Sequence, residues 1–216
     1  METTKVKVTM ENGQTFVIEL CPEQAPITCE NFLGLVKEGF YNGLTFHRVI
    51  EDFMAQGGDP EGTGFGGSSK TIKGEFARNG FKQNTLSHTR GVISMARSSD
   101  YDSASSQFFI CYDDASFLDG SYAAFGMVTE GMEVVDGFLE VERRYNSSGE
   151  LASPVEPIVI EKAEVITRCK PYALVHCIIE SLVGLAHNVG ELNSACFCKH
   201  TYQYYVYRFN IARLLC

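Results

Sequence analysis

The sequence predicts a fold dominated by β-structure, either a closed barrel or a sandwich. Short apolar runs with strand-like alternation recur through residues 4 to 167, and turn residues separate them. Only two stretches in this region have the period of a helix. Strands and helices therefore do not alternate regularly, which argues against βαβ units and a parallel sheet.

The chain opens with a predicted hairpin and a helix. Lys5 to Val8 alternates polar and apolar residues, Asn12-Gly13 is a strong hairpin turn, and Thr15 to Leu20 continues the alternation. From Pro26 to Glu38 the apolar residues recur at helical spacing, and Gly39 is placed as a C-terminal stop.

Two short strands, Thr45 to Val49 and Phe53 to Gln56, are predicted next. Simple alternation places Phe46, Arg48 and Ile50 on one face of the first strand. His47 and Val49 are then expected on the opposite face.

A glycine-rich loop and further strands complete the predicted fold. Residues 57 to 67 contain six glycines, typical of an irregular loop, and no Gly-Lys-Ser/Thr follows that would favour phosphate binding. A short helix is predicted over Met132 to Phe138. The remaining strands are expected at Gly91 to Met95, Gln107 to Ile110, Ala123 to Val128 and Ile158 to Val165.

Composition limits the possible functions and divides the chain. A net charge of -9 without a basic cluster argues against nucleic-acid binding. The charged first residues lack the apolar core of a secretory signal, so we expect a cytoplasmic protein with no membrane span. Residues 1 to 167 contain 13 Lys or Arg and 25 Asp or Glu, a net charge of -12. Residues 168 to 216 contain 5 Lys or Arg and 2 Asp or Glu, a net charge of +3. We therefore expect a domain over 1–167 and an extension over 168–216.

The extension is expected to be an amphipathic helix or disordered. Apolar residues from Leu174 to Val189 recur at helical spacing. Soft metal ligands also gather in the extension, at Cys169, His176, Cys177, Cys196, Cys198 and His200. Because they include no C-x-x-C unit, unpaired thiols are the preferred interpretation and zinc is the alternative. We predict no metal and no cofactor.

Arg48 is the candidate functional side chain, and its surroundings in the sequence allow two interpretations. One interpretation is an exposed guanidinium whose stem covers apolar neighbours. The other is a hydrogen-bond donor held at the rim of an apolar pocket. Neither Ser94 nor Ser106 has a histidine and a carboxylate nearby in sequence, so covalent catalysis is not the first choice.

Four ordered motifs resemble those of one family. The first is Tyr41-x-x-Leu44-x-Phe46-His47-Arg48-Val49-Ile50-x-x-Phe53-Met54-x-Gln56-Gly57-Gly58-Asp59. The others are Gly91 to Ala96, Ser106 to Ile110, and Phe117 to Gly120 continuing to Phe125-Gly126. Together they resemble cyclophilins, the cyclosporin-binding peptidyl-prolyl cis-trans isomerases, over about residues 4 to 167. The resemblance implies a closed eight-stranded antiparallel barrel capped by two helices, with a peptide groove on its outer face.

The resemblance also implies roles for individual residues. Arg48 matches the catalytic arginine, with Gln56 beside it, and Gln56 and Gln107 match groups that orient the substrate backbone. The proline ring is expected against Phe53, Met54, Phe109 and Leu118. Ala96 and Arg97 match the segment that contacts the residue before proline, and Gly64 and Gly66 lie in the loop beside the neighbouring pocket.

Three residues depart from the common pattern of the family. Phe117 stands where many members have tryptophan, so the indole donor to cyclosporin is missing and weakened drug binding is expected. Tyr122 replaces a histidine at the groove edge. Arg97 replaces an asparagine and is expected to favour acidic residues before proline. The stretch from Ala96 to Ser106 is more similar to bacterial members.

The predicted function is isomerisation of X-Pro bonds in peptides and folding proteins by a monomer, without a covalent intermediate. The predicted partners are proline-containing peptides and protein chains, with cyclosporin as a weak ligand. An alternative is a proline-peptide binding module whose residues 168 to 216 recruit a partner. A metal- or redox-regulated isomerase is a third possibility.

Overall fold

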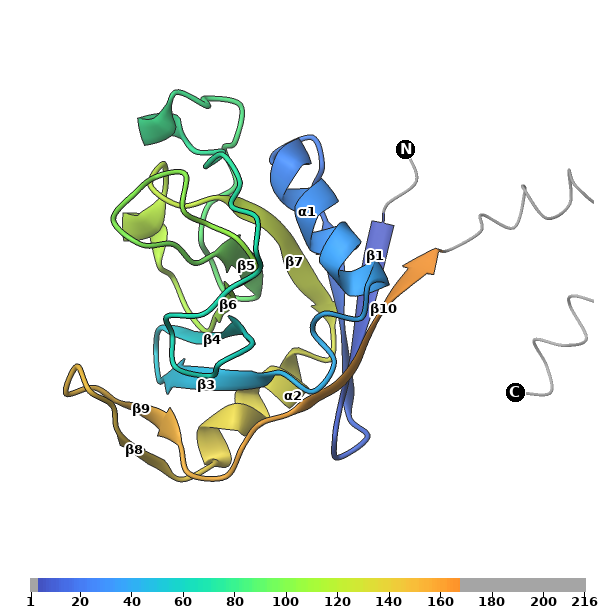
Figure 1. Cartoon of the computed structure of the whole chain (residues 1–216), viewed down its shortest axis with the longest axis vertical. Helices are drawn as coiled ribbons and strands as arrows, with labels where there is room; N and C mark the ends of the chain where they lie inside the picture. Colours follow the sequence, from blue (N-terminus) through green and yellow to red (C-terminus); the bar gives the residue numbers. More distant parts are fainter. Residues whose placement is uncertain (1–3, 168–216) are drawn as a thin grey trace, which may run out of the picture. The chain divides into compact units, whose positions relative to one another are not determined.

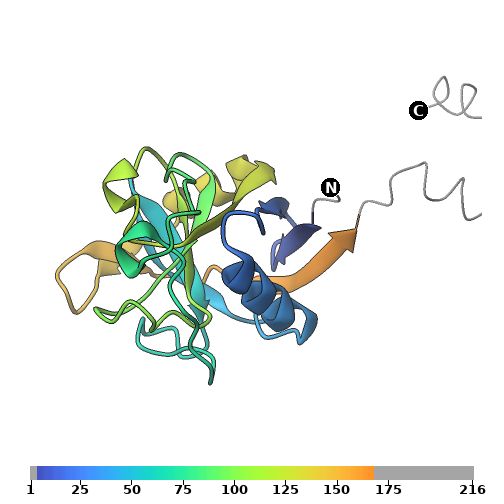
Figure 2. The same ribbon diagram turned by 90° about the horizontal axis from the view of Figure 1, so that it is seen from above.

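The computed structural model describes residues 4 to 167. The amphipathic helix, the zinc ligands and the recruiting extension predicted for residues 168 to 216 lie outside the described residues. Eight strands form one sheet in the order β10-β1-β2-β7-β5-β6-β4-β3, and every pair of neighbours is antiparallel. Figure 1 shows this sheet curling around the core, with α1 and α2 near opposite ends, and Figure 2 shows it from above.

The strands of the sheet occur close to where the alternation predicts them. Their bounds are β1 Thr4–Met10, β2 Thr15–Leu20, β3 Thr45–Ile50, β4 Met54–Asp59, β5 Val92–Met95, β6 Phe108–Cys111, β7 Ala124–Glu130 and β10 Ile160–Thr167. The α-helices are α1 Pro26–Lys37 and α2 Met132–Asp136, and three 3-10 turns cover Ala77–Asn79, Ser116–Leu118 and Gly137–Glu140. Among the described residues no helix is both long and apolar enough to cross a membrane.

Aromatic side chains fill the core between the sheet and the helices. Phe32 of α1 is 1% exposed, and its ring centroid lies 5.1 Å from that of Phe125 on β7. Phe46 and Phe108 meet edge to face at 5.8 Å. Packing of this kind stabilises a fold beyond the area that it buries. Cys29 and Cys111 are buried free thiols, and burial raises the pKa of each to about 12.

The sheet is curled but not closed, so the predicted closed barrel is wrong in this respect. Its edge strands β3 and β10 do not share a ladder, although they meet where one isolated bridge joins Thr45 to Val159 and Phe46 donates its backbone N–H to the carbonyl of Ile158. Pro157 lies two residues before Val159. Because proline has no backbone N–H, it cannot donate the next hydrogen bond that would continue this pairing along β3.

The predicted faces of β3 are also partly wrong. The register of β3 against β4 shifts on both sides of Phe46, as it does where a bulge places an extra residue in one strand. Phe46 and Val49 are consequently in the core, at 1% and 0% exposure, while the Arg48 side chain is 29% exposed. Phe46 therefore does not share a face with Arg48.

One element escapes the sequence prediction altogether. β8 Arg143–Tyr145 and β9 Leu151–Pro154 form a separate two-stranded sheet. Figure 1 shows this hairpin beside β3, away from the first hairpin. It supplies one wall of the site described next.

Candidate functional site

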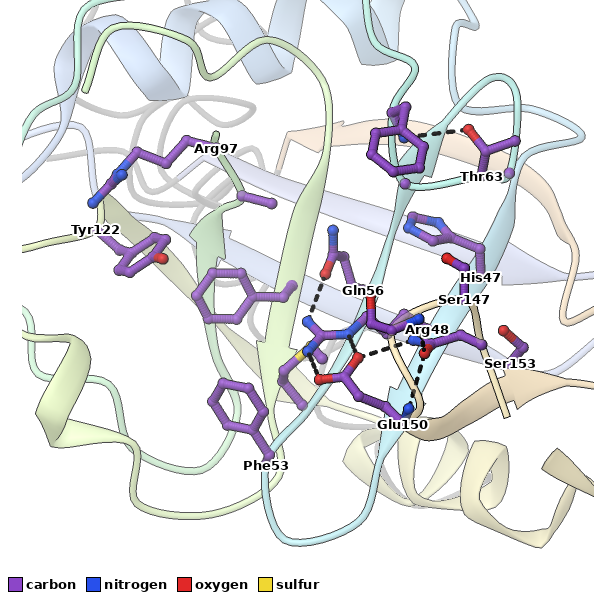
Figure 3. A pocket seen from close by; sticks show the side chains of 18 of the residues that line it. His47, Arg48, Phe53, Gln56, Thr63, Arg97, Tyr122, Ser147, Glu150 and Ser153 are labelled. Atoms are coloured by element: carbon purple, nitrogen blue, oxygen red, sulfur yellow. Dashed lines mark hydrogen bonds and ion pairs between the residues drawn. The ribbon is translucent and has the colours of Figure 1, made fainter. Parts of the chain in front are cut away.

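A groove of about 400 Å³ opens on the outer face of β3 and β4. Arg48 lies across from Gln56 in the β3–β4 ladder, and its Nη1 donates to Gln56 Oε1 at 3.1 Å. The bulge next to Arg48 turns its side chain out of the core and into this groove. The interpretation of Arg48 as a donor beside an apolar pocket therefore fits the geometry, and Figure 3 shows it at the centre of the groove.

Glu150 is a partner of Arg48 that the sequence prediction missed. Its Oε2 accepts from Arg48 Nε at 2.9 Å, and its Oε1 accepts from Arg48 Nη2 at 2.7 Å. The hydrogen bonds from Arg48 and then Asn146 hold the pKa of Glu150 below its ordinary value. Asn146-Ser147-Ser148-Gly149 is a turn signal that could have identified the hairpin, but nothing in sequence spacing links it to a residue about 100 positions earlier.

Two glutamines connect Arg48 to the glycine-rich loop. Gln56 donates from Nε2 to Gln107 Oε1 at 2.8 Å. Gln107 in turn donates to the carbonyl oxygens of Gly64 at 3.0 Å and Gly66 at 2.7 Å. Gly64 has φ +88°, a conformation that L side chains rarely adopt. Gln107 and Gly66 thus support the groove from behind and are not among the residues that line it.

Asp59 at the end of β4 organises the same loop. One carboxylate oxygen accepts from the backbone N–H of Glu61, and the other accepts from those of Thr63 and Gly64. Burial alone would raise the pKa of Asp59, but hydrogen bonds from the backbone of Glu61, Gly64 and Gly66 lower it and outweigh burial. An ionised carboxylate therefore fixes this wall of the groove at neutral pH.

The predicted proline pocket is assembled from four separate segments. Met54, Phe109 and Leu118 are 1%, 5% and 9% exposed and form a second apolar cluster, against which Phe53 and Tyr122 pack. The rings of Phe109 and Tyr122 meet edge to face at 6.0 Å. All five line the groove, as does Ala96.

Phe117 lies outside that pocket. It is 71% exposed and does not line the groove, but its ring centroid lies 5.7 Å from that of Phe53. It therefore extends the apolar surface beyond the proline pocket.

Arg97 lines the groove, and three of its five N–H groups are bonded to backbone carbonyls. Its Nε and Nη2 donate to the carbonyl oxygen of Ser121, and its Nη1 donates to that of Ser98. The guanidinium carbon lies 4.5 Å from the ring centroid of Tyr122 and 4.9 Å from that of Tyr101. This geometry braces two loops through cation–π contacts and hydrogen bonds.

The structure contains a Ser-His-Asp arrangement that was not predicted from the sequence. Nε2 of His88 lies 2.9 Å from Ser94 Oγ, and Nδ1 lies 2.7 Å from Asp119 Oδ1. Ser94 is 0% exposed and Ser106 is also fully buried, so neither hydroxyl meets the groove. The arrangement serves the packing beneath Phe109, whose ring stacks on His88 at 6.0 Å.

His47 is a second feature of the groove that the sequence prediction did not assign. Both ring nitrogens are buried without a hydrogen-bond partner. Burial lowers the pKa of His47, as does Arg48, and Asp59 opposes them. Among residues 4 to 167 no group of three or more His, Cys, Asp or Glu side chains could hold a metal ion.

Comparisons with known proteins agree on one family. Residues 5–165 match the family model described as cyclophilin type peptidyl-prolyl cis-trans isomerase/CLD. A peptidyl-prolyl cis-trans isomerase of Helicobacter pylori is 49% identical over 127 residues, which are 58% of this chain and 74% of that protein. Peptidyl-prolyl cis-trans isomerase B of Bacillus subtilis is 47% identical over 124 residues, which are 57% of this chain and 82% of that protein.

Two crystal structures of a Cryptosporidium parvum cyclophilin type isomerase have a similar fold. The first superposes with a TM-score of 0.67 at 29% identity, covering 77% of this chain and 99% of that one. The second, determined in the presence of the dipeptide Ala-Pro, has a TM-score of 0.66 at 31% identity. The match covers 76% of this chain and 99% of that one.

Proposed function

We propose, from the premise that the chain belongs to the cyclophilin-type peptidyl-prolyl cis-trans isomerase family and is an isomerase of that class, that Arg48 is its catalytic residue. The substrates are peptides and folding protein chains that contain proline. The observation that carries this assignment is the position of the Arg48 guanidinium, which lies beside an apolar pocket and is held by Gln56.

The reaction needs a donor to the proline nitrogen. Rotation about a peptide bond meets a barrier of ~18–20 kcal/mol because the nitrogen lone pair is delocalised into the carbonyl. As the bond twists, that lone pair becomes localised on the nitrogen and can accept a hydrogen bond. A guanidinium placed there stabilises the twisted transition state more than either planar isomer, and this difference accelerates rotation.

The apolar pocket gives this interaction its strength. Met54, Phe109 and Leu118 receive the proline ring, and Phe53 and Tyr122 complete the pocket. Expulsion of water by the ring lowers the local dielectric, so that the hydrogen bond from Arg48 becomes more favourable.

The polar residues around Arg48 position the substrate backbone. Gln56 holds Arg48 on one side and Gln107 on the other, so its amide has one remaining N–H for a substrate carbonyl. Ala96 and Arg97 contact the residue before proline from the opposite end of the groove. Arg97 favours an acidic residue at that position through its positive charge and its two remaining N–H groups, while the other three stay on backbone carbonyls.

Replacement of Arg48 tests this function. In Arg48→Ala, kcat/KM for an X-Pro peptide should fall by about 10²–10³-fold, the typical effect of removing one donor to developing charge in a transition state. Arg90→Ala is a matched control, because Arg90 pairs with Asp136 at 2.6 Å and does not line the groove. Unchanged activity in Arg48→Ala would exclude the mechanism.

Cyclosporin binding belongs to the same proposal in a weakened form. Phe117 offers a ring next to Phe53 but no N–H donor. The drug therefore binds less tightly than it would to a groove with tryptophan at this position. We propose that the isomerase acts as a monomer, because a single chain supplies Arg48, the apolar pocket and Gln56, and the groove needs no residue from a second copy to be complete.

The alternative of a proline-binding scaffold depends on residues 168 to 216, which lie outside the described residues. In the part of the groove formed by residues 4 to 167, no contact favours a scaffold over catalysis.

A further inference from the structure

Glu150 binds the edge of the Arg48 guanidinium that carries Nε and Nη2. Both carboxylate oxygens accept from the guanidinium, at 2.9 Å from Nε and 2.7 Å from Nη2, in the two-pronged geometry that makes such pairs strong. A third donor, Nη1, is on Gln56. A guanidinium has five N–H groups, so about two of them, one on each Nη, stay available to a substrate.

The hairpin fixes the carboxylate in this place. Asn146 Nδ2 donates to Glu150 Oε2 at 2.9 Å, and Asn146 Oδ1 accepts from the backbone N–H of Glu150 at 2.9 Å. The backbone N–H of Asn146 also donates to the carbonyl of Glu150 at 2.8 Å. Hydrogen bonds within the β8–β9 turn thus position Glu150, and Figure 3 shows its carboxylate next to Arg48.

This pair sets the charge next to the proline pocket. Arg48 and Glu150 together carry no net charge, and the other hairpin residues that line the groove are the neutral Asn146, Ser147, Ser148 and Ser153. Figure 3 shows Arg97 on the opposite side of Arg48 from the hairpin. With the residue before proline near Arg97, the residue after proline passes close to Glu150.

We infer that Glu150 is a specificity-determining residue that disfavours an acidic residue immediately after proline and favours a basic one. The inference rests on the proposed function, since it concerns peptides bound at Arg48. Without Glu150 the groove would carry the full positive charge of Arg48 and would attract an acidic residue. With Glu150 that attraction is cancelled, and a lysine after proline gains a nearby carboxylate.

Exchange NMR on three peptides tests the inference. The peptides share the sequence Ala-Ala-Pro-X-Ala, with Glu, Gln or Lys as X, and the readout is the ratio of kcat/KM for Lys to that for Glu. We expect the wild-type ratio to exceed one, and Glu150→Gln to lower it by about two- to fivefold, the range of a partly exposed charge pair. The charge-retaining Glu150→Asp should keep a ratio above one.

A matched control removes one negative charge elsewhere. Glu164 on β10 has a side chain 39% exposed, close to the 38% of Glu150, and pairs with Lys162 at 2.7 Å, so Glu164→Gln should leave the ratio unchanged. Raising the salt concentration should bring the wild-type ratio toward one, a test that needs no variant. An unchanged ratio in Glu150→Gln, an equal change in Glu164→Gln, or a wild-type ratio that does not respond to salt would overturn the inference. Absence of wild-type activity on all three peptides would instead contradict the proposed function.

Discussion

The ring of His88 is hydrogen-bonded at both nitrogens, to Asp119 Oδ1 at 2.7 Å and to Ser94 Oγ at 2.9 Å. Burial lowers the pKa of His88 in spite of the opposing pull of the Asp119 carboxylate, so the ring is neutral at pH 7. The pKa of Asp119 is lowered, so its carboxylate is ionised and can only accept, and the ring proton therefore lies on Nδ1. The same oxygen also accepts from the backbone N–H of His88. Nε2 is then an acceptor for the Ser94 hydroxyl.

Ser94→Ala should destabilise the fold while leaving the groove chemistry intact. The substitution leaves the buried Nε2 of His88 without a donor, and an unsatisfied buried group costs about 1–3 kcal/mol. Urea unfolding measures the loss, with Ser116→Ala as a control because Ser116 is exposed. Equal stabilities of the two variants would show that the Ser94 hydrogen bond contributes nothing net.

The stability of the protein should fall as the solution becomes mildly acidic, and His47 should contribute to the fall. Its pKa is lowered from 6.5 in the folded state, so below about pH 6.5 the unfolded chain binds the proton more readily. The stabilisation is complete above that pH and is lost as the pH drops toward the folded pKa. Asp59 and Arg48 are the charged groups that act on this ring.

His47→Gln should reduce this pH dependence. Because glutamine does not titrate, the slope of unfolding free energy against pH should fall by at most about 1.4 kcal/mol per pH unit. A residual slope should persist, since the pKa of His88 is lowered too. Unfolding titrations between about pH 7.5 and pH 5.5 provide the measurement, and identical slopes for the two proteins would rule out His47 as a contributor.

Phe117→Trp should tighten cyclosporin binding with little change in isomerase activity. The indole N–H adds one hydrogen bond of about 0.5–1.5 kcal/mol, which corresponds to about a two- to twelvefold lower Kd. The wild-type chain contains no tryptophan, so fluorescence of the introduced indole reports binding directly. Phe65→Trp is the control, since Phe65 is 89% exposed at a different part of the groove. The same gain from both variants would contradict a specific role for position 117.

A chain ending at Thr167 should retain kcat/KM within about twofold, the scatter expected for changes distant from a site. Within the described part of the chain, every residue that lines the groove lies between His47 and Ser153. Peptide exchange NMR on the shortened and full chains gives the comparison, with far-UV circular dichroism as a check of folding. A large loss of activity in a folded shortened chain would assign residues 168 to 216 a catalytic contribution.

Local patterns predicted the elements well because their causes are local. The turn at Asn12-Gly13 and the stop at Gly39 depend on backbone conformations that glycine adopts readily, and both have positive φ in the structure. The faces of β3 were mispredicted because a bulge depends on the partner strand and interrupts simple alternation. The open edge likewise depends on how two distant strands meet.

The site was predictable only where the resemblance covers it. The motifs placed Arg48, Phe53, Met54 and Phe109 together, and the groove contains all four. Spacing could not predict the Arg48–Glu150 pair or the link from His88 to Ser94 and Asp119, because these contacts join separate segments. The cytoplasmic location and the extension over 168–216 stay predictions.

The β8–β9 hairpin is hydrogen-bonded as its own sheet, separate from the eight strands that surround the core. Substitutions in its turn that keep Asn146 and Glu150 can therefore accumulate with little effect on the strands that carry Arg48 and the proline pocket. Relatives that share the same catalytic scaffold could diverge in sequence preference through this turn alone. Changes in this hairpin, natural or engineered, can thus alter which client proteins the isomerase acts on.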